Sequence, residues 1–174
     1  DVLRLEALGL DTPADRSLLS GLRARAGSRS EALEAIEEAI AEDPTQAADW
    51  LSYANLLYEE GESSKALDAA DKCLEIDRQC GGAWALTATI LAPKQNRLKE
   101  ALKAAIHAVA LDSGGVDLVL LKADLLLADG QATAAEESLV KSLEKDAMNG
   151  ELRARIATRY LLDGRPEDAQ NLLD

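Results

Sequence analysis

Residues 47–80 read AADWLSYANLLYEEGESSKALDAADKCLEIDRQC and contain two helical patterns on either side of a glycine. In the first pattern Trp50, Ala54 and Leu57 follow the spacing i, i+4, i+7, which places them on one face of a helix. Gly61 follows, and glycine readily takes the left-handed conformation that ends a helix. The stretch therefore predicts two helices joined by a tight turn, over about residues 47–60 and 63–76.

The same residue types return along the chain at steps of 34 or 35 residues. A period in this range indicates a stacked array of supersecondary units, each of which buries its apolar face against its neighbours. We therefore predict an all-α solenoid of tandem helix-turn-helix repeats. Three of the recurring sets are Gly27, Gly61, Asn96, Gly130 and Gly164; Ala32, Ala66, Ala101, Ala135 and Ala169; and Asp43, Asp77, Asp112 and Asp146.

The period divides the chain into five repeats and a short leading piece. The single step of 35 falls where Pro93 ends a first helix early, and Asn96 then stands where the other repeats have glycine. Asn tolerates the left-handed conformation well, so we expect it to close that helix as glycine does. By this division we expect the chain to begin and to stop inside a repeat. The predicted segments are 1–12, the tail of a preceding repeat; 13–46, 47–80, 81–115 with its one-residue insertion, and 116–149, repeats 1 to 4; and 150–174, a truncated repeat 5.

In its unit length and its small and large apolar positions the chain resembles the tetratricopeptide repeat (TPR) family. The family has a large apolar residue at unit position 4, here Trp50, Trp84 and Val119, and a small residue at position 8. The resemblance implies a right-handed α-solenoid. Pentatricopeptide repeats share the period but bind RNA, which the charge of this chain disfavours. Position 8 is Ser20, Ala54, Ala88, Ala123 and Ala157, and departures from the family pattern are Arg16, Arg23, Thr87, Lys122 and Arg153.

The charge of the chain excludes some partners. Its 32 acidic and 19 basic residues give a net charge of -13. Binding to nucleic acid needs clustered Lys and Arg, and an anionic membrane is disfavoured for the same reason. No apolar run is long enough to cross a bilayer. We expect a soluble protein that binds no nucleic acid and does not insert into membranes, with the cytoplasm favoured slightly over the periplasm.

The sequence offers no catalytic, cofactor or metal motif. His107 is the only histidine, at an outward-facing position of a second helix, and one histidine cannot supply a metal site. Cys73 occupies a small-residue packing position, which favours a buried structural thiol. A bridge between Cys73 and Cys80 is disfavoured but not excluded. We therefore predict that the chain is not an enzyme and carries no cofactor and no metal ion.

The resemblance places the functional surface on the first helices, whose positions 2, 5, 9, 12 and 13 line the concave side of such arrays. The apolar members of this set either pack against the neighbouring repeat or form a floor for a ligand helix or strand, and the sequence leaves both readings open. Acidic members outnumber basic ones, so a partner with basic and apolar residues fits best. The candidate groove residues are Leu51, Asn55, Tyr58, Glu59, Thr89, Asp117, Leu120, Asp124, Leu127, Glu151, Thr158 and Leu161.

We therefore predict a protein–protein interaction scaffold or adaptor that binds a partner segment in the concave groove, within a larger protein or a multi-protein assembly. One alternative is a regulatory or substrate-docking array of an enzyme whose catalytic domain lies elsewhere. Another is self-assembly through the exposed ends of the array.

Overall fold

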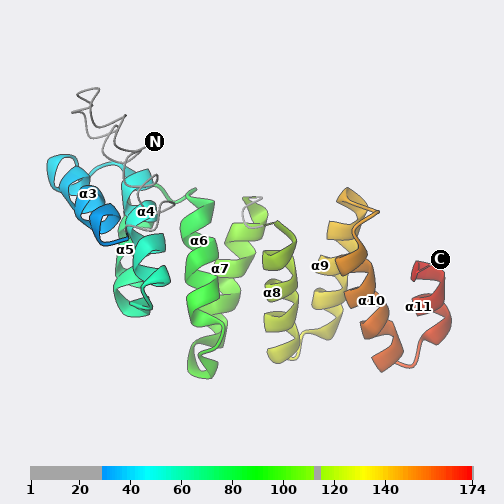
Figure 1. Cartoon of the computed structure of the whole chain (residues 1–174). Helices are drawn as coiled ribbons and strands as arrows, with labels where there is room; N and C mark the ends of the chain where they lie inside the picture. The colour runs from blue at the N-terminus through cyan, green and yellow to red at the C-terminus, as the bar shows by residue number, and fades with distance from the viewer. Residues whose placement is uncertain (1–28, 112–114, 174) are drawn as a thin grey trace.

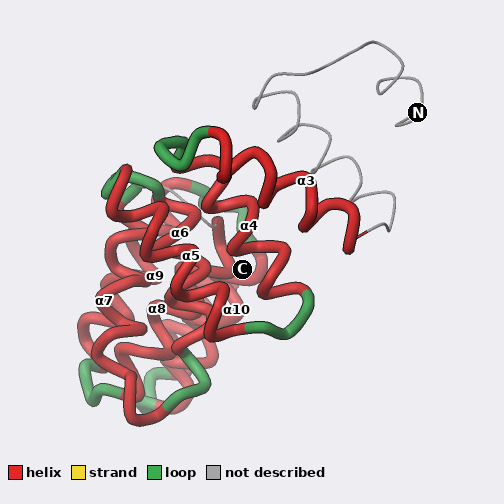
Figure 2. The backbone as a smooth tube through the Cα atoms, turned by 90° about the vertical axis from the view of Figure 1, so that its left-hand side faces the viewer, coloured by secondary structure: helices red, strands yellow, loops and turns green. Residues whose placement is uncertain are grey.

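The computed structural model of the chain describes residues 29–111 and 115–173. In these two ranges the backbone forms helices and turns and no strand, as Figure 2 shows, so the predicted all-α class is confirmed. No helix in them combines the length and the apolar character needed to cross a lipid bilayer. The leading segment and the first helix of repeat 1 were predicted for residues that lie outside this description.

The helices stand side by side in a row that runs from α3 to α11 (Figure 1). The two helices predicted over 47–60 and 63–76 are confirmed to within one residue at each end. The bounds are α3 Arg29–Glu42, α4 Ala47–Glu59, α5 Ser63–Ile76, α6 Gly81–Leu91, α7 Leu98–Ala110, α8 Gly115–Ala128, α9 Ala132–Lys145, α10 Gly150–Leu162 and α11 Pro166–Leu173.

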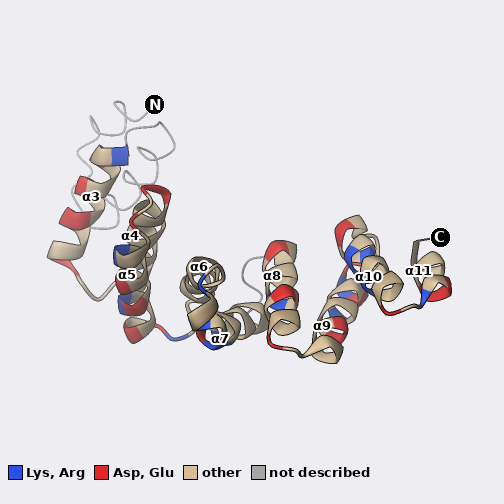
Figure 3. Cartoon of the chain, turned by 90° about the horizontal axis from the view of Figure 1, so that it is seen from below, with Lys and Arg blue, Asp and Glu red and all other residues tan. Residues whose placement is uncertain are grey.

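The row is curved. Figure 3 shows α6 and α8 on the inner side of the curve and α7 and α9 on its outer side. We call the inner side, which carries the first helices α4, α6, α8 and α10, the concave face, and the outer side, which carries α5, α7 and α9, the convex face. Each helix packs against its neighbours along the chain, and the closest packing is within the pairs α4–α5 and α6–α7.

Alanine lines the helix crossings inside the array. Because its side chain is a single methyl group, two helix backbones can approach closely wherever both contribute alanine. Leucines at the ends of the first helices fill the space between the alanines; Leu57 and Leu91 are at most 5% exposed. In the described ranges thirteen alanines are at most 1% exposed: Ala32, Ala39, Ala54, Ala66, Ala70, Ala83, Ala88, Ala101, Ala104, Ala105, Ala108, Ala123 and Ala135.

The glycine turns confirm the predicted helix closure. Gly61, Gly130 and Gly164 have φ of 83°, 78° and 73°, in the left-handed region that glycine tolerates. In the first of these turns the N–H of Glu62 donates to the carbonyl of Leu57 over 2.9 Å, and the N–H of Gly61 donates to the carbonyl of Tyr58. This pair of bonds is the Schellman motif, which satisfies the last carbonyl groups of a helix.

Asn96 does not close its helix in this way, so that prediction was wrong. Residues Gln95–Arg97 form a 3-10 helix, and the N–H of Lys94 donates to the carbonyl of Leu91. A 3-10 helix has negative φ throughout, so Asn96 sits in a right-handed turn. The inserted residue explains the difference, because a longer link reaches α7 without a left-handed residue.

Candidate functional site

The glycine turns place three apolar side chains at equivalent points of the concave face. Tyr58, Leu127 and Leu161 each lie three residues before a glycine with positive φ, and their carbonyl groups accept the N–H of that glycine. These residues are 39%, 36% and 57% exposed, and they are three of the nine large apolar residues that are exposed in the described ranges. The turn geometry therefore repeats an exposed apolar group along the array. We call these three residues the apolar stripe.

Leu51 and Leu120, which were predicted about two helical turns before Tyr58 and Leu127, are not part of that exposed surface. Leu120 is 7% exposed and belongs to the core cluster around α8. Leu51 is half-buried, and its Cδ2 atom would lie 2.9 Å from a Cβ added to Gly82 on α6. Both residues pack against neighbouring helices, which was the alternative that the sequence left open. A ligand in the groove cannot rest on the buried Leu120.

Two of the four predicted groove carboxylates are ion-paired. An Nη2 atom of Arg155 on α10 lies 3.0 Å from Oδ2 of Asp124 on α8. The Nε atom of Arg29 on α3 lies 3.4 Å from Oε2 of Glu59. Sequence reasoning missed both arginines, although the separation of 31 residues between Asp124 and Arg155 is close to the repeat period and could have indicated the pair.

The remaining two carboxylates, Asp117 and Glu151, form no ion pair with any residue in the described ranges. Each lies in the first turn of its helix, α8 and α10 respectively, where the helix dipole favours negative charge. Both are exposed. Of the four predicted groove carboxylates, Asp117 and Glu151 are therefore the two that no described cation neutralises.

The neutral polar members of the predicted set are also exposed. Thr89 and Thr158 donate their hydroxyl protons to the carbonyl groups one turn back, at Ala85 and Ala154, over 2.9 and 2.8 Å. Their hydroxyl oxygens are therefore left as acceptors for an incoming donor. Asn55 is exposed on α4. Together with the carboxylates, these groups make a surface that suits N–H donors.

A hollow of about 440 Å³ opens on the concave face between α6 and α8. Its lining is mostly apolar, and Asp124 contributes the charged group. The link that carries the inserted residue supplies Gln95, so the insertion helps to shape this hollow. Asp124 is the one lining residue among the candidate groove residues. Gln95 and Leu98 lie beyond the first helices, and Leu121 and Leu125 stand at positions of α8 that the family pattern does not assign to the groove. The full lining is Ala92, Gln95, Leu98, Leu121, Asp124, Leu125 and Ala128.

Two predictions for side chains outside the groove are confirmed: His107 is exposed and Cys73 is buried. The ring of His107 is exposed, and it also stacks on Trp84 with a centroid separation of 4.7 Å. Cys73 is fully buried, and its sulfur lies 2.8 Å from that of Cys80, with both thiols free. In residues 29–111 and 115–173 no group of three or more His, Cys, Asp or Glu side chains could hold a metal ion.

Comparison with solved structures places this arrangement among repeat proteins. No protein-family profile matches the chain, and no curated protein matches its sequence. The structure of MamA 41-end from Desulfovibrio magneticus RS-1 superposes with a TM-score of 0.76 at 18% identity, over 93% of this chain and 91% of that one.

Two further structures are described as TPR proteins. YrrB, "a TPR protein with an unusual peptide-binding site", superposes with a TM-score of 0.72 at 19% identity, over 92% of this chain and 82% of that one. TTC0263, a thermophilic TPR protein of Thermus thermophilus, gives 0.62 at 20% identity, over 92% and 88%. At these identities the likeness establishes the fold: the chain folds as a tetratricopeptide-repeat array.

Proposed function

We propose that the chain is an interaction scaffold or adaptor that binds a segment of a partner protein along the concave face. The observation that carries the proposal is the apolar stripe, Tyr58, Leu127 and Leu161, exposed near the C-terminal ends of α4, α8 and α10. Asp117 and Glu151, which form no ion pair in the described ranges, stand at the other end of α8 and α10, in their first turns. Large apolar groups exposed in a row cost solvation free energy unless a partner covers them. That one similar array, YrrB, is described as having a peptide-binding site supports the same role here.

The partner segment carries apolar side chains and Lys or Arg. Its apolar groups cover the stripe and enter the hollow between α6 and α8, which takes up to about 440 Å³. Its cations face Asp117 and Glu151, and the hydroxyl oxygens of Thr89 and Thr158 accept further N–H groups. Charge complementarity of this kind raises the association rate and suppresses binding of acidic segments.

A peptide-display selection on the purified chain tests this function. Selected peptides should combine Lys or Arg with Leu, Phe or another large apolar residue. They should lose affinity for the variant Leu161→Ser, which removes an exposed leucine from the stripe at little cost to folding. They should bind the variant Glu34→Lys, changed on the exposed side of α3, as well as they bind the unaltered chain. Selection of acidic peptides, or of peptides that bind Leu161→Ser as tightly as the unaltered chain, would contradict the proposal.

A role as the docking array of an enzyme with a catalytic domain elsewhere has no support in the described residues. Association between copies has one favourable observation, because Leu162 and Leu173 on α10 and α11 are 75% and 52% exposed. Sedimentation velocity over a hundredfold concentration range tests it. A single monomeric species for the unaltered chain would remove this second candidate, and a dimer abolished by Leu162→Ser and Leu173→Ser would support it.

A further inference from the structure

A second hollow, of about 470 Å³, opens on the convex face between α7, α8 and α9. It is separate from the concave groove, because Lys122 in its lining lies on the opposite side of α8 from Asp124 and Leu127. Its apolar lining includes Ile106, Val116 and Val119. Three lysines, Lys122, Lys141 and Lys145, also line it.

At this hollow α8 lacks the aromatic residue that α4 and α6 carry at the equivalent point. Val119 lies 35 residues after Trp84, which itself lies 34 residues after Trp50. The ring of Trp84 packs against His107 with a centroid separation of 4.7 Å, and its indole N–H donates to the carbonyl of Arg78. Lys141 stands 34 residues after His107. The space that an indole ring fills beside α7 is therefore open beside α9.

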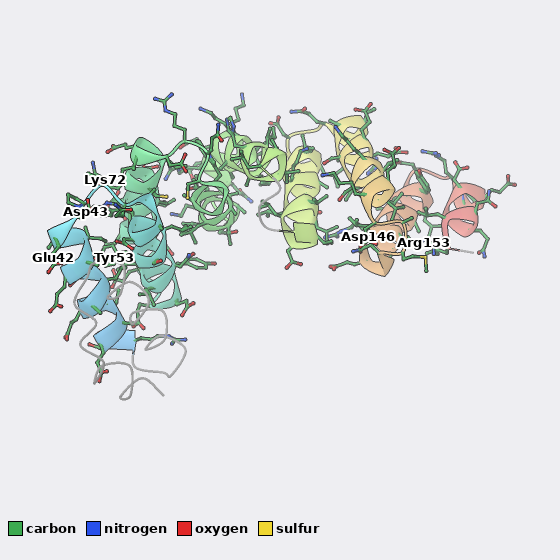
Figure 4. The ribbon with its side chains drawn as sticks, turned by 90° about the horizontal axis from the view of Figure 1, so that it is seen from above. Glu42, Asp43, Tyr53, Lys72, Asp146 and Arg153 are labelled. Atoms are coloured by element: carbon green, nitrogen blue, oxygen red, sulfur yellow. The ribbon has the colours of Figure 1, made fainter. Side chains whose placement is uncertain are left out.

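The charged groups in this hollow also differ from those at the equivalent points of the preceding helix pairs. Lys122 stands where α4 carries Tyr53, which is labelled in Figure 4. The hydroxyl of Tyr53 donates to Glu37 on the preceding helix, α3, over 2.9 Å. The residues equivalent to Glu37 are Asp71 in the next pair and Ile106 beside Lys122. The preceding helix thus offers an apolar group where the other two pairs offer a carboxylate.

Lys122 is consequently a half-buried cation without a counter-charge. The side-chain ammonium groups of Lys122 and Lys141 form no ion pair and no hydrogen bond with the residues that the structure describes. Burial, and secondly the nearby charge of Lys141, lower the pKa of Lys122. Asp146 also lines the hollow, so Lys122 and Lys141 alone outnumber it there, in a chain that is strongly acidic overall.

We propose that this hollow binds an aromatic side chain and an adjacent carboxylate, presented by an acidic segment of a partner protein. The ring occupies the volume that Trp84 fills in the preceding pair, against Val119 and Ile106. The carboxylate lies between Lys122 and Lys141 and supplies the anion that the preceding helix lacks. The array then carries two binding faces of opposite charge preference, a basic partner on the concave face and an acidic one on the convex face.

The test uses the peptide acetyl-Glu-Trp-Glu-amide and its neutral counterpart acetyl-Gln-Trp-Gln-amide, titrated into the 15N-labelled chain. The acidic peptide should give saturable shifts at the amides of Val119, Lys122 and Lys141, and the neutral peptide should bind about fivefold or more weakly. Lys122→Met keeps a long, unbranched side chain and removes the charge. It should weaken binding of the acidic peptide by a similar factor. The matched control is Lys72→Ala, at the position on α5 equivalent to Lys141, which should bind as the unaltered chain does.

A second variant tests the aromatic part. Val119→Trp restores the residue of the preceding pairs and fills the hollow, so it should abolish the shifts at Lys122 and Lys141 while the chain stays folded. If that variant does not fold, the Lys122→Met comparison decides. The proposal falls if the unaltered chain shows no saturable shift, if the neutral peptide binds equally well, if Lys122→Met leaves the affinity unchanged, or if the shifts map to the concave face.

Discussion

The guanidinium of Arg155 on α10 lies 3.0 Å from the carboxylate of Asp124 on α8, and the pair joins first helices of two successive helix pairs across the concave face. Both side chains are about half exposed, at 47% and 48%. The pair neutralises a carboxylate that would otherwise face a ligand. Groove charge therefore has to be assigned from contacts as well as from residue types.

Removing this ion pair should cost little stability. A double-mutant cycle with Asp124→Asn and Arg155→Gln should give a coupling free energy below about 1 kcal/mol, because exposed pairs are screened by water and salt. Urea unfolding at low and high salt measures it. A coupling of several kcal/mol that does not change with salt would show that the pair holds α8 and α10 together.

Substituting a glycine that has positive φ should lower the free energy of unfolding, whereas substituting a glycine inside a helix should not. Gly61→Ala and Gly130→Ala place a Cβ at φ of 83° and 78° and should each lower the free energy of unfolding by about 1 kcal/mol. Gly150→Ala is the control, since it begins α10 with nothing within 4 Å of the added methyl group and should be neutral or stabilising. Equal effects of all three on the thermal midpoint would contradict the turn geometry.

Because of Cys73, the free energy of unfolding should fall as the pH rises through the alkaline range. Burial, with a hydrogen bond to Cys80, raises the pKa of the Cys73 thiol from 9.0 to about 12. The unfolded chain therefore loses this proton at a lower pH than the folded chain does. The stability that the protonated Cys73 thiol gives the folded chain is fully present below pH 9 and is lost as the pH rises toward 12.

The measurement is the difference in free energy of unfolding between the unaltered chain and Cys73→Ala, followed from pH 8 to 11. The unaltered chain should lose stability relative to the variant as the pH rises. A difference that stays constant would mean that the thiol ionises normally in the folded chain. Alkylation of the native chain should also reach the half-buried Cys80 before Cys73.

The sequence predicted the regular part of the fold because that part depends on local signals that recur. The period, the helix-closing glycines and the alanines at the crossings each fix one feature of a helix pair, and the ends of α4 and α5 agree with the prediction to within one residue. The turn around Asn96 could not be predicted in the same way. One extra residue changes which hydrogen bonds close α6, and a residue preference does not carry that information.

The groove was harder to predict because exposure depends on the neighbouring helix. Leu120 and Leu127 lie on one side of α8, and the sequence alone treats them alike. Packing against neighbouring helices buries the first, while the second stands at the helix end with 36% of its surface exposed. Arg155 was not predicted, because its position in the repeat is not one of those that line the groove in the family.

We propose that the concave face binds a basic, apolar segment through the apolar stripe and through Asp117 and Glu151 at the other end of α8 and α10. The most direct measurement is the association rate of a selected basic peptide with Asp117→Lys and with Glu34→Lys, at two salt concentrations. Both variants change the net charge equally, but only Asp117 lies on the concave face. The account predicts that Asp117→Lys slows association by about fivefold or more at low salt and less at high salt, while Glu34→Lys has little effect. Equal slowing by the two variants would show that only net charge matters, and the concave face would no longer be the binding site.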